Sequence, residues 1–245
     1  MRSVLRSMTR SKHAIPAAGR AARLGHVDDA SLSRLVAVTG PAGSSNVALA
    51  AALASVRNAP AGSCAVILVE GVSDQAAIEV LAARQGRDLS RDGVFAVPMG
   101  GATNVGSFLD LFGPRGLRAR LAGLCDEGEE HVFRHGLARA GLHPGPARRD
   151  LERLGFYVCV ADLEDEMIRS LGTAAVERLI AGQGELASFR TFCRQPAQRD
   201  RTREQQLRRF LGTRSGRKAH YGRVLAEALD LTHVPRPLDR VLAYV

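Results

Sequence analysis

The chain has 245 residues, 45% hydrophobic and 24% charged, which suits a globular protein with a substantial core. No run approaches the roughly 18 apolar residues of a membrane span, and the basic amino terminus lacks the apolar centre of a secretory signal. We therefore expect a cytoplasmic protein without membrane contact. The net charge of +9 favours an anionic partner such as nucleic acid. Because the only lysines are Lys12 and Lys218, an arginine-rich codon bias also explains that charge.

The four cysteines are widely spaced and form no CxxC pair. We expect reduced, mostly buried thiols rather than a disulfide framework or a zinc site. They are Cys64, Cys125, Cys159 and Cys193.

Residues 1–62 are predicted to form a basic, partly disordered segment. Within it, LVAVTGPAGSSNVALAAALASV is similar to the strand, glycine turn and helix of a phosphate-binding P-loop. That motif needs GK[ST] five residues after its first glycine, but Gly40 is followed there by Ser45, Asn46 and Val47. We therefore favour an alanine-rich helix after a Gly/Pro turn over an ATP site.

From Cys64 onward, apolar strands alternate with helices. CAVILVE is predicted as a strand and the following SDQAAIEVLAARQG as a helix, with Ser73 as its N-cap. Further strands are predicted over residues 92–101, 117–126 and 155–165, and further helices over 103–113 and 129–141. Continuous apolar strands alternating with helices predict an α/β fold, with a parallel sheet covered on both faces.

The carboxy-terminal part is predicted to be a helical extension. Period-3.6 spacing indicates helices over residues 173–183, 204–212, 216–230 and 237–245. The segments 144–155 and 194–205 are rich in polar residues and are expected to be exposed connectors.

Acidic residues follow three of the four predicted strands. Glu70 ends the first, Asp126 ends the third, and Asp162 and Glu164 end the fourth. Parallel sheets bind ligands at the carboxyl ends of their strands, where such acids would meet and need a cation. An acid that opens a helix can instead serve the helix dipole, which accounts for Glu129, Glu130 and Asp165. It does not account for Glu70 or Asp126.

The motifs VILVEGVSDQAAIEVLA, VPMGGATNVGSFL and LAGLCDEGEE resemble those of a TOPRIM domain, the metal-binding module of topoisomerases, primases and certain nucleases. VADLEDEMIRSLG and TRSGRKAHYGRVLAEAL are similar to the overcoming-lysogenization-defect (OLD) nuclease type. The resemblance covers about residues 64–230. It predicts a TOPRIM-type domain with a helical extension over residues 63–245, without the ATPase domain that usually precedes it.

The resemblance implies a Mg²⁺- or Mn²⁺-dependent endonuclease. Its metal ligands match Glu70, Asp74, Asp126 and Glu164, and its charge-stabilising lysine matches Lys218. Glu70 is also expected to transfer a proton. The usual DxD motif reads Asp126-Glu127-Gly128 and lacks its second acid. Its substitutes are expected among three residues: Glu127, Glu129 and Asp162.

Basic residues near this site are expected to contact a nucleic-acid backbone, with a solvated face as the alternative. We assign this role to Arg208, Arg209, Arg214 and Arg217, beside the further basic residues Arg199, Arg201 and Arg203. The expected partners are DNA rather than RNA, a separate ATPase subunit and a second copy of the chain. Asn104 is expected to cap its helix or to orient a metal-bound group.

Two other functions stay open. A DxD motif without its second acid allows a non-catalytic module that binds nucleotide or nucleic acid and acts with an ATPase. The same metals also support nucleotidyl transfer, as in primases.

Overall fold

The computed structural model describes residues 44–57, 64–213 and 216–245. The helices and strands are, in chain order, α2 (Ser44–Arg57), β1 (Ala65–Val69), α3 (Val72–Arg84), β2 (Val94–Pro98), η1 (Ala102–Asn104), α4 (Val105–Phe112), β3 (Arg120–Asp126), η2 (Glu127–Glu129), α5 (Glu130–Arg139), α6 (Arg148–Arg153), β4 (Phe156–Cys159), α7 (Leu163–Leu171), α8 (Thr173–Gly182), α9 (Leu186–Cys193), η3 (Pro196–Gln198), α10 (Arg203–Leu211), α11 (Arg217–Ala228) and α12 (Arg236–Tyr244).

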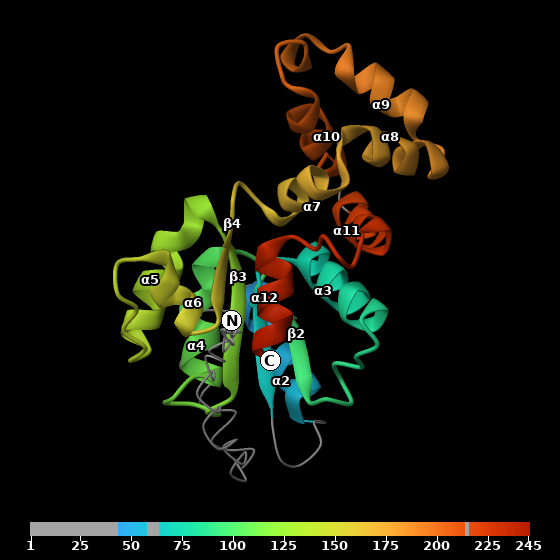
Figure 1. Ribbon diagram of the computed structural model, residues 1–245. Coiled ribbons are helices and arrows are strands. Elements are labelled where there is room, and N and C mark those ends of the chain that lie inside the picture. Colours follow the sequence, from blue (N-terminus) through green and yellow to red (C-terminus); the bar gives the residue numbers. More distant parts are fainter. Residues whose placement is uncertain (1–43, 58–63, 214–215) are drawn as a thin grey trace, which may run out of the picture.

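The four strands form one parallel sheet, as the sequence predicts, and their order is β2-β1-β3-β4 (Figure 1). The chain passes from β1 to β2 on one side and then to β3 on the other side of β1. The strand order therefore reverses between β1 and β3, and such a switch point is where open α/β sheets bind ligands. Leu68 pairs with Gly123, so Glu70, just after β1, and Asp126, which ends β3, reach the same edge.

Both faces of the sheet are covered, because side chains of a strand alternate between its two faces. Ile67 and Val69 of β1 belong to a core shared with α3, α7, α11 and α12. Val66 and Leu68 belong to a second core shared with α2, α4, α5 and α6. These four side chains have no exposed surface, which explains why β1 reads as a continuous apolar run.

The helical extension is confirmed. Helices α8, α9 and α10 project beyond the carboxyl ends of the strands, and α11 and α12 return to the α/β body (Figure 1). Phe189 packs edge-to-face on Phe210 inside the extension, with ring centroids 5.0 Å apart. Helix α11 lies close against α3: a Cβ on Gly222 would stand 2.6 Å from the carbonyl oxygen of Ser73.

Four local predictions are wrong. Gly71, not Ser73, is the N-cap of α3, and Ser73 is buried in its first turn. The fourth strand ends at Cys159, and Asp162 instead caps α7. The predicted connector 144–155 contains α6, because Leu151 is fully buried under the sheet. The connector 194–205 contains η3 and the start of α10. In addition, α9 was not predicted.

The described part of residues 1–62 is α2, which confirms the predicted alanine-rich helix. The strand and glycine turn of the P-loop-like stretch lie outside the described residues. Leu49, Leu53 and Val56 of α2 are buried in the second core, so this helix packs on the α/β body. The domain division at residues 62 and 63 stays a prediction.

The four cysteines are free thiols, and all but the half-buried Cys193 are buried, as expected. Among the described helices, none has the length and apolar character that a bilayer crossing would require.

Candidate metal centre

Glu70 and Asp126 meet at the switch point of the sheet, and Glu129 joins them. Each of these three half-buried residues offers one carboxylate oxygen, and the three oxygens lie within 4.8 Å of one another. Oxygen ligands of one Mg²⁺ stand up to about 4.2 Å apart, twice the bond length of about 2.1 Å. The three oxygens are therefore close enough for modest side-chain movements to bring them onto one ion.

The backbone of Glu70 is held by the glycine turn after β2. Its carbonyl oxygen accepts hydrogen bonds from the N–H groups of Gly100, at 3.0 Å, and Gly101, at 3.2 Å. Both glycines have positive φ angles, of 73° and 125°, which strain any residue with a side chain. Asn104 does not cap its helix through its side chain; its Nδ2 donates to the carbonyl of Met99 at 2.9 Å and so braces this turn.

Burial and the repulsion of nearby acids raise the pKa values of Asp126 and Glu129. Burial, followed by the charges of Glu70 and Asp162, raises the pKa of Asp126 to about 8. Burial and the nearby Glu70 also raise the pKa of Glu129. Its Oε2 is buried and has no hydrogen-bond partner among the described residues. Because an unpartnered buried oxygen is costly, this set of donors fits a cation that would satisfy it.

A second group of acids lies beside the first. Asp74 is buried in the first turn of α3, where its Oδ2 accepts from the N–H of Gly71 at 2.9 Å. Asp162 caps α7 through the N–H of Asp165 and also binds Arg208. Glu164 is 3% exposed, and neither of its oxygens has a hydrogen-bond partner among the described residues.

Lys218, in the first turn of α11, faces this second group. Its Nζ lies 3.5 Å from Oε2 of Glu164. Burial raises the pKa of Glu164 to about 7 despite this lysine. Burial lowers the pKa of Lys218, but the attraction of Glu164, Asp74 and Asp162 outweighs it, so the net shift is upward. Lys218 is therefore held as an ammonium ion.

Residues 63–127 match the model of the overcoming lysogenization defect protein-like TOPRIM domain. This segment is therefore similar to an OLD-like TOPRIM domain. This segment includes β1, β2, β3 and two of the three converging acids, Glu70 and Asp126. Among curated proteins, no sequence matches the chain.

Solved structures share the fold over most of the chain. The C-terminal region of the Xanthomonas campestris pv. campestris OLD protein is 22% identical and gives a TM-score of 0.57; the match covers 74% of this chain and 94% of that one. The C-terminal region of the Burkholderia pseudomallei OLD protein is 19% identical and gives a TM-score of 0.55, with 74% and 95% covered. These likenesses confirm the α/β TOPRIM fold with its helical extension.

Of the three substitute acids that the sequence leaves open, Glu129 is the one that lies together with Glu70 and Asp126. Glu127, the other neighbour of Asp126, is exposed and binds Arg148 instead. The η2 turn brings Glu129 back over the end of β3, whereas the TOPRIM motif places its second acid at position 128. Sequence analysis favoured a helix-dipole role for Glu129, and only the turn geometry distinguishes it from its neighbours.

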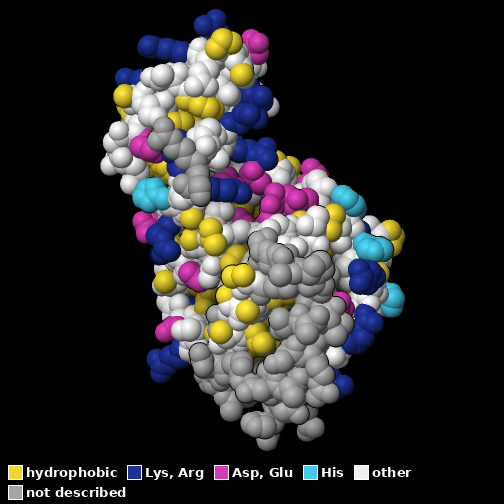
Figure 2. Space-filling model, turned by 180° about the vertical axis from the view of Figure 1, so that it is seen from behind, with side chains coloured by type: hydrophobic (Ala, Val, Ile, Leu, Met, Phe, Trp, Pro, Cys, Tyr) yellow, Lys and Arg dark blue, Asp and Glu magenta, His cyan; other side chains and the backbone are white. Residues whose placement is uncertain are grey.

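The arginines assigned to nucleic acid differ from one another. Arg209 is exposed, and Arg208 binds Asp162. Arg217 has a side chain 7% exposed, donates to Glu185 at 2.7 Å and stacks on Phe210, which favours a structural role. Arg214 lies outside the described residues. Figure 2 shows the acidic side chains gathered where the extension meets the α/β body, with basic side chains beside them.

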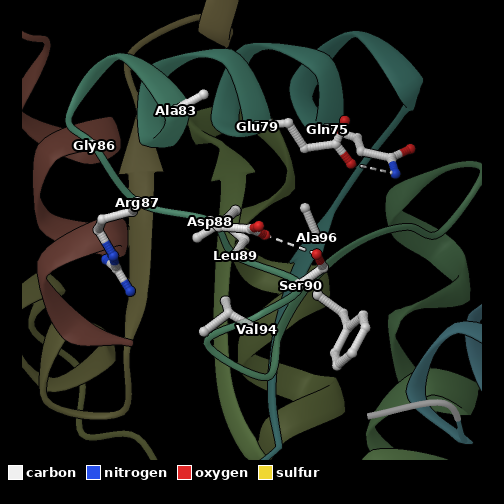
Figure 3. A pocket seen from close by; sticks show the side chains of 11 residues that line it. Gln75, Glu79, Ala83, Gly86, Arg87, Asp88, Leu89, Ser90, Val94 and Ala96 are labelled. Carbon is white, nitrogen blue, oxygen red and sulfur yellow. Dashed lines mark hydrogen bonds between the residues drawn. The ribbon is translucent and has the colours of Figure 1, made fainter. Parts of the chain in front are cut away.

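A separate pocket of ≈ 660 Å³ lies between α3 and the edge strand β2, around Glu79, Asp88 and Ala96 (Figure 3). It is lined from the amino-terminal half of β2, whereas the acids follow the carboxyl ends of the strands. It includes none of the acids at the switch point, and its polar side chains already bond one another: Gln75 to Glu79 and Ser90 to Asp88.

Proposed function

We propose that this TOPRIM domain hydrolyses phosphodiester bonds of nucleic acid, DNA in the first instance, with Mg²⁺ or Mn²⁺ bound at Glu70, Asp126 and Glu129. The observation that carries the proposal is the meeting of these three half-buried acids at the switch point, with no lysine or arginine nitrogen within 4.0 Å of them among the described residues. When bound, the divalent ion supplies Lewis-acid stabilisation of phosphate charge and lowers the pKa of water.

The chain itself supplies proton transfer and positive charge. Glu70 stands on the rigid end of β1, with its backbone fixed by two hydrogen bonds, and is the group we assign as general acid or base. Lys218 offers an ammonium group close to the acids, where it stabilises negative charge that develops on the phosphate. We assign to Arg209, which is exposed on the extension, the role of holding the substrate backbone.

An ATPase partner remains part of the proposal. The relatives of this fold are C-terminal regions of OLD proteins, and the OLD resemblance implies that an ATPase acts with the TOPRIM domain. We propose that a separate ATPase subunit and a second copy of this chain complete the assembly.

The test is nicking of supercoiled plasmid by the purified full chain with Mg²⁺ or Mn²⁺. We expect nicking by the wild type, none in excess chelator, and none by Glu70→Ala. Glu227→Ala, which removes an exposed acid of α11, is the matched control and should nick normally. Equal nicking by wild type and Glu70→Ala would refute the proposal. Metal and DNA binding without nicking would instead indicate a non-catalytic module.

A further inference from the structure

The acids at the carboxyl edge of the sheet fall into two groups, which differ in whether a lysine or arginine side chain contacts them. Glu70, Asp126 and Glu129 converge without a lysine or arginine contact among the described residues, and they form the one group there whose ligand atoms are close enough to share an ion. In the second group, which comprises Asp74, Asp162 and Glu164, Lys218 lies 3.5 Å from Glu164 and attracts all three acids more strongly than it attracts Glu70.

Glu164 is the centre of the second group. Its side chain is only 3% exposed, and neither of its oxygens accepts a hydrogen bond from a described residue. The Nζ of Lys218 at 3.5 Å is too far for a good hydrogen bond, so its contribution is mainly electrostatic. A buried carboxylate needs a compensating charge, and Lys218 provides it.

The fold holds Lys218 in this place. Gly222, one helical turn further along α11, lets that helix approach the backbone of Ser73 next to Asp74. Tyr221 and Arg217 of the same helix both donate to Glu185, at 2.8 Å and 2.7 Å. Helix α11 is thus fixed against both α3 and the helical extension. Lys218 can therefore leave the acids only by a movement of its own side chain, not of the helix.

We propose that this chain binds one divalent ion, at Glu70, Asp126 and Glu129, and that the ammonium group of Lys218 takes the place of a second ion beside Glu164. The inference rests on the proposed function, because it concerns the same metal centre. A cation on Lys218 repels a divalent ion a few ångströms away, while removing the lysine leaves Glu164 and Asp74 free to bind one.

The test is calorimetric titration of the metal-free full chain with Mn²⁺. We expect one ion per wild-type chain and two per chain of Lys218→Met, which keeps the length of the side chain and removes its charge. Lys218→Arg keeps the charge and should stay at one. Glu164→Gln should also stay at one, whereas Glu129→Gln should bind its ion about tenfold to a hundredfold more weakly. Two ions in the wild type, or one ion in folded Lys218→Met, would overturn the inference.

Electron paramagnetic resonance of the wild type gives a measurement that does not depend on the variant. At two equivalents of Mn²⁺ we expect the spectrum of isolated ions, and a spectrum of two magnetically coupled ions would contradict the inference. Two bound ions with normal nicking would remove this inference and leave the proposed function intact. No bound ion and no nicking would remove the proposed function.

Discussion

Two neighbouring glutamates at the start of α5 show how the site differs from the rest of the surface. Glu130 binds Arg134 at 2.7 Å and Arg148 at 3.0 Å, and despite burial these bonds lower its pKa. Glu129 faces Glu70 and Asp126 instead, and its pKa is raised. Glu130 is thus held in the fold by two arginines, whereas Glu129 has no arginine or lysine within 4.0 Å among the described residues. The absence of a basic partner beside Glu70, Asp126 and Glu129 therefore distinguishes the candidate metal centre from the rest of the surface.

The largest expected effect concerns pH, because the two kinds of acid contribute to stability with opposite signs. A carboxyl whose folded pKa is raised stabilises the fold while protonated, and this stability is lost as pH rises through the folded pKa. Asp126, at about 8, and Glu164, at about 7, behave in this way. Without metal, we expect the free energy of unfolding to fall by on the order of a few kcal/mol between pH 5 and pH 8.

Urea unfolding in chelator at these pH values tests this expectation. Glu130 and Glu152, whose arginine bonds lower their pKa, contribute stability that is lost only at lower pH. Asp126→Asn should therefore flatten the decline between pH 5 and 8, whereas Glu152→Gln should not. Mn²⁺ should restore more stability at pH 8 than at pH 5. A metal-free protein that is equally stable at pH 5 and pH 8 would contradict the expected loss of stability from Asp126 and Glu164.

The next effect concerns metal affinity at the two adjacent glutamates. Glu129→Gln removes a proposed ligand and should weaken Mn²⁺ binding by about tenfold to a hundredfold, on the order of 1.4 to 2.7 kcal/mol. Glu130→Gln, one residue away, removes only an arginine partner and should change the affinity by less than about twofold. Calorimetry of both variants measures the difference, and equal losses would show that proximity to Asp126 matters more than the absence of an arginine.

The smallest expected effect concerns DNA binding by the extension. Arg209→Ala should weaken binding about threefold and reduce the slope of log affinity against log salt by about one, because one phosphate contact is lost. The control is Arg91→Ala, which removes an exposed arginine near the amino-terminal end of β2. Fluorescence anisotropy at several salt concentrations measures both. An unchanged slope for Arg209→Ala would indicate a solvated face.

Much of the fold followed from the sequence because its signals are local. The fully buried β1 reads as an apolar run, and the alternation of such runs with helical spacing indicated a parallel sheet. Helix α6 was missed because its short, charged sequence RRDLER has a single buried apolar residue, Leu151, too few for a periodic pattern. Helix α9 lacks a strong start signal: Glu185, its N-cap residue, makes no side-chain capping bond.

The sequence by itself determined that acids follow the strands and that their pattern is of the OLD-like TOPRIM type, since residue order along a strand and its turn is enough for both. Tertiary structure alone decided which acids meet. Strand order placed Glu70 beside Asp126, and the η2 turn brought in Glu129 rather than Glu127. The close packing of α11 on α3 brought Lys218 to Glu164 across 54 positions of chain. Such contacts depend on packing between distant segments, which no local pattern encodes.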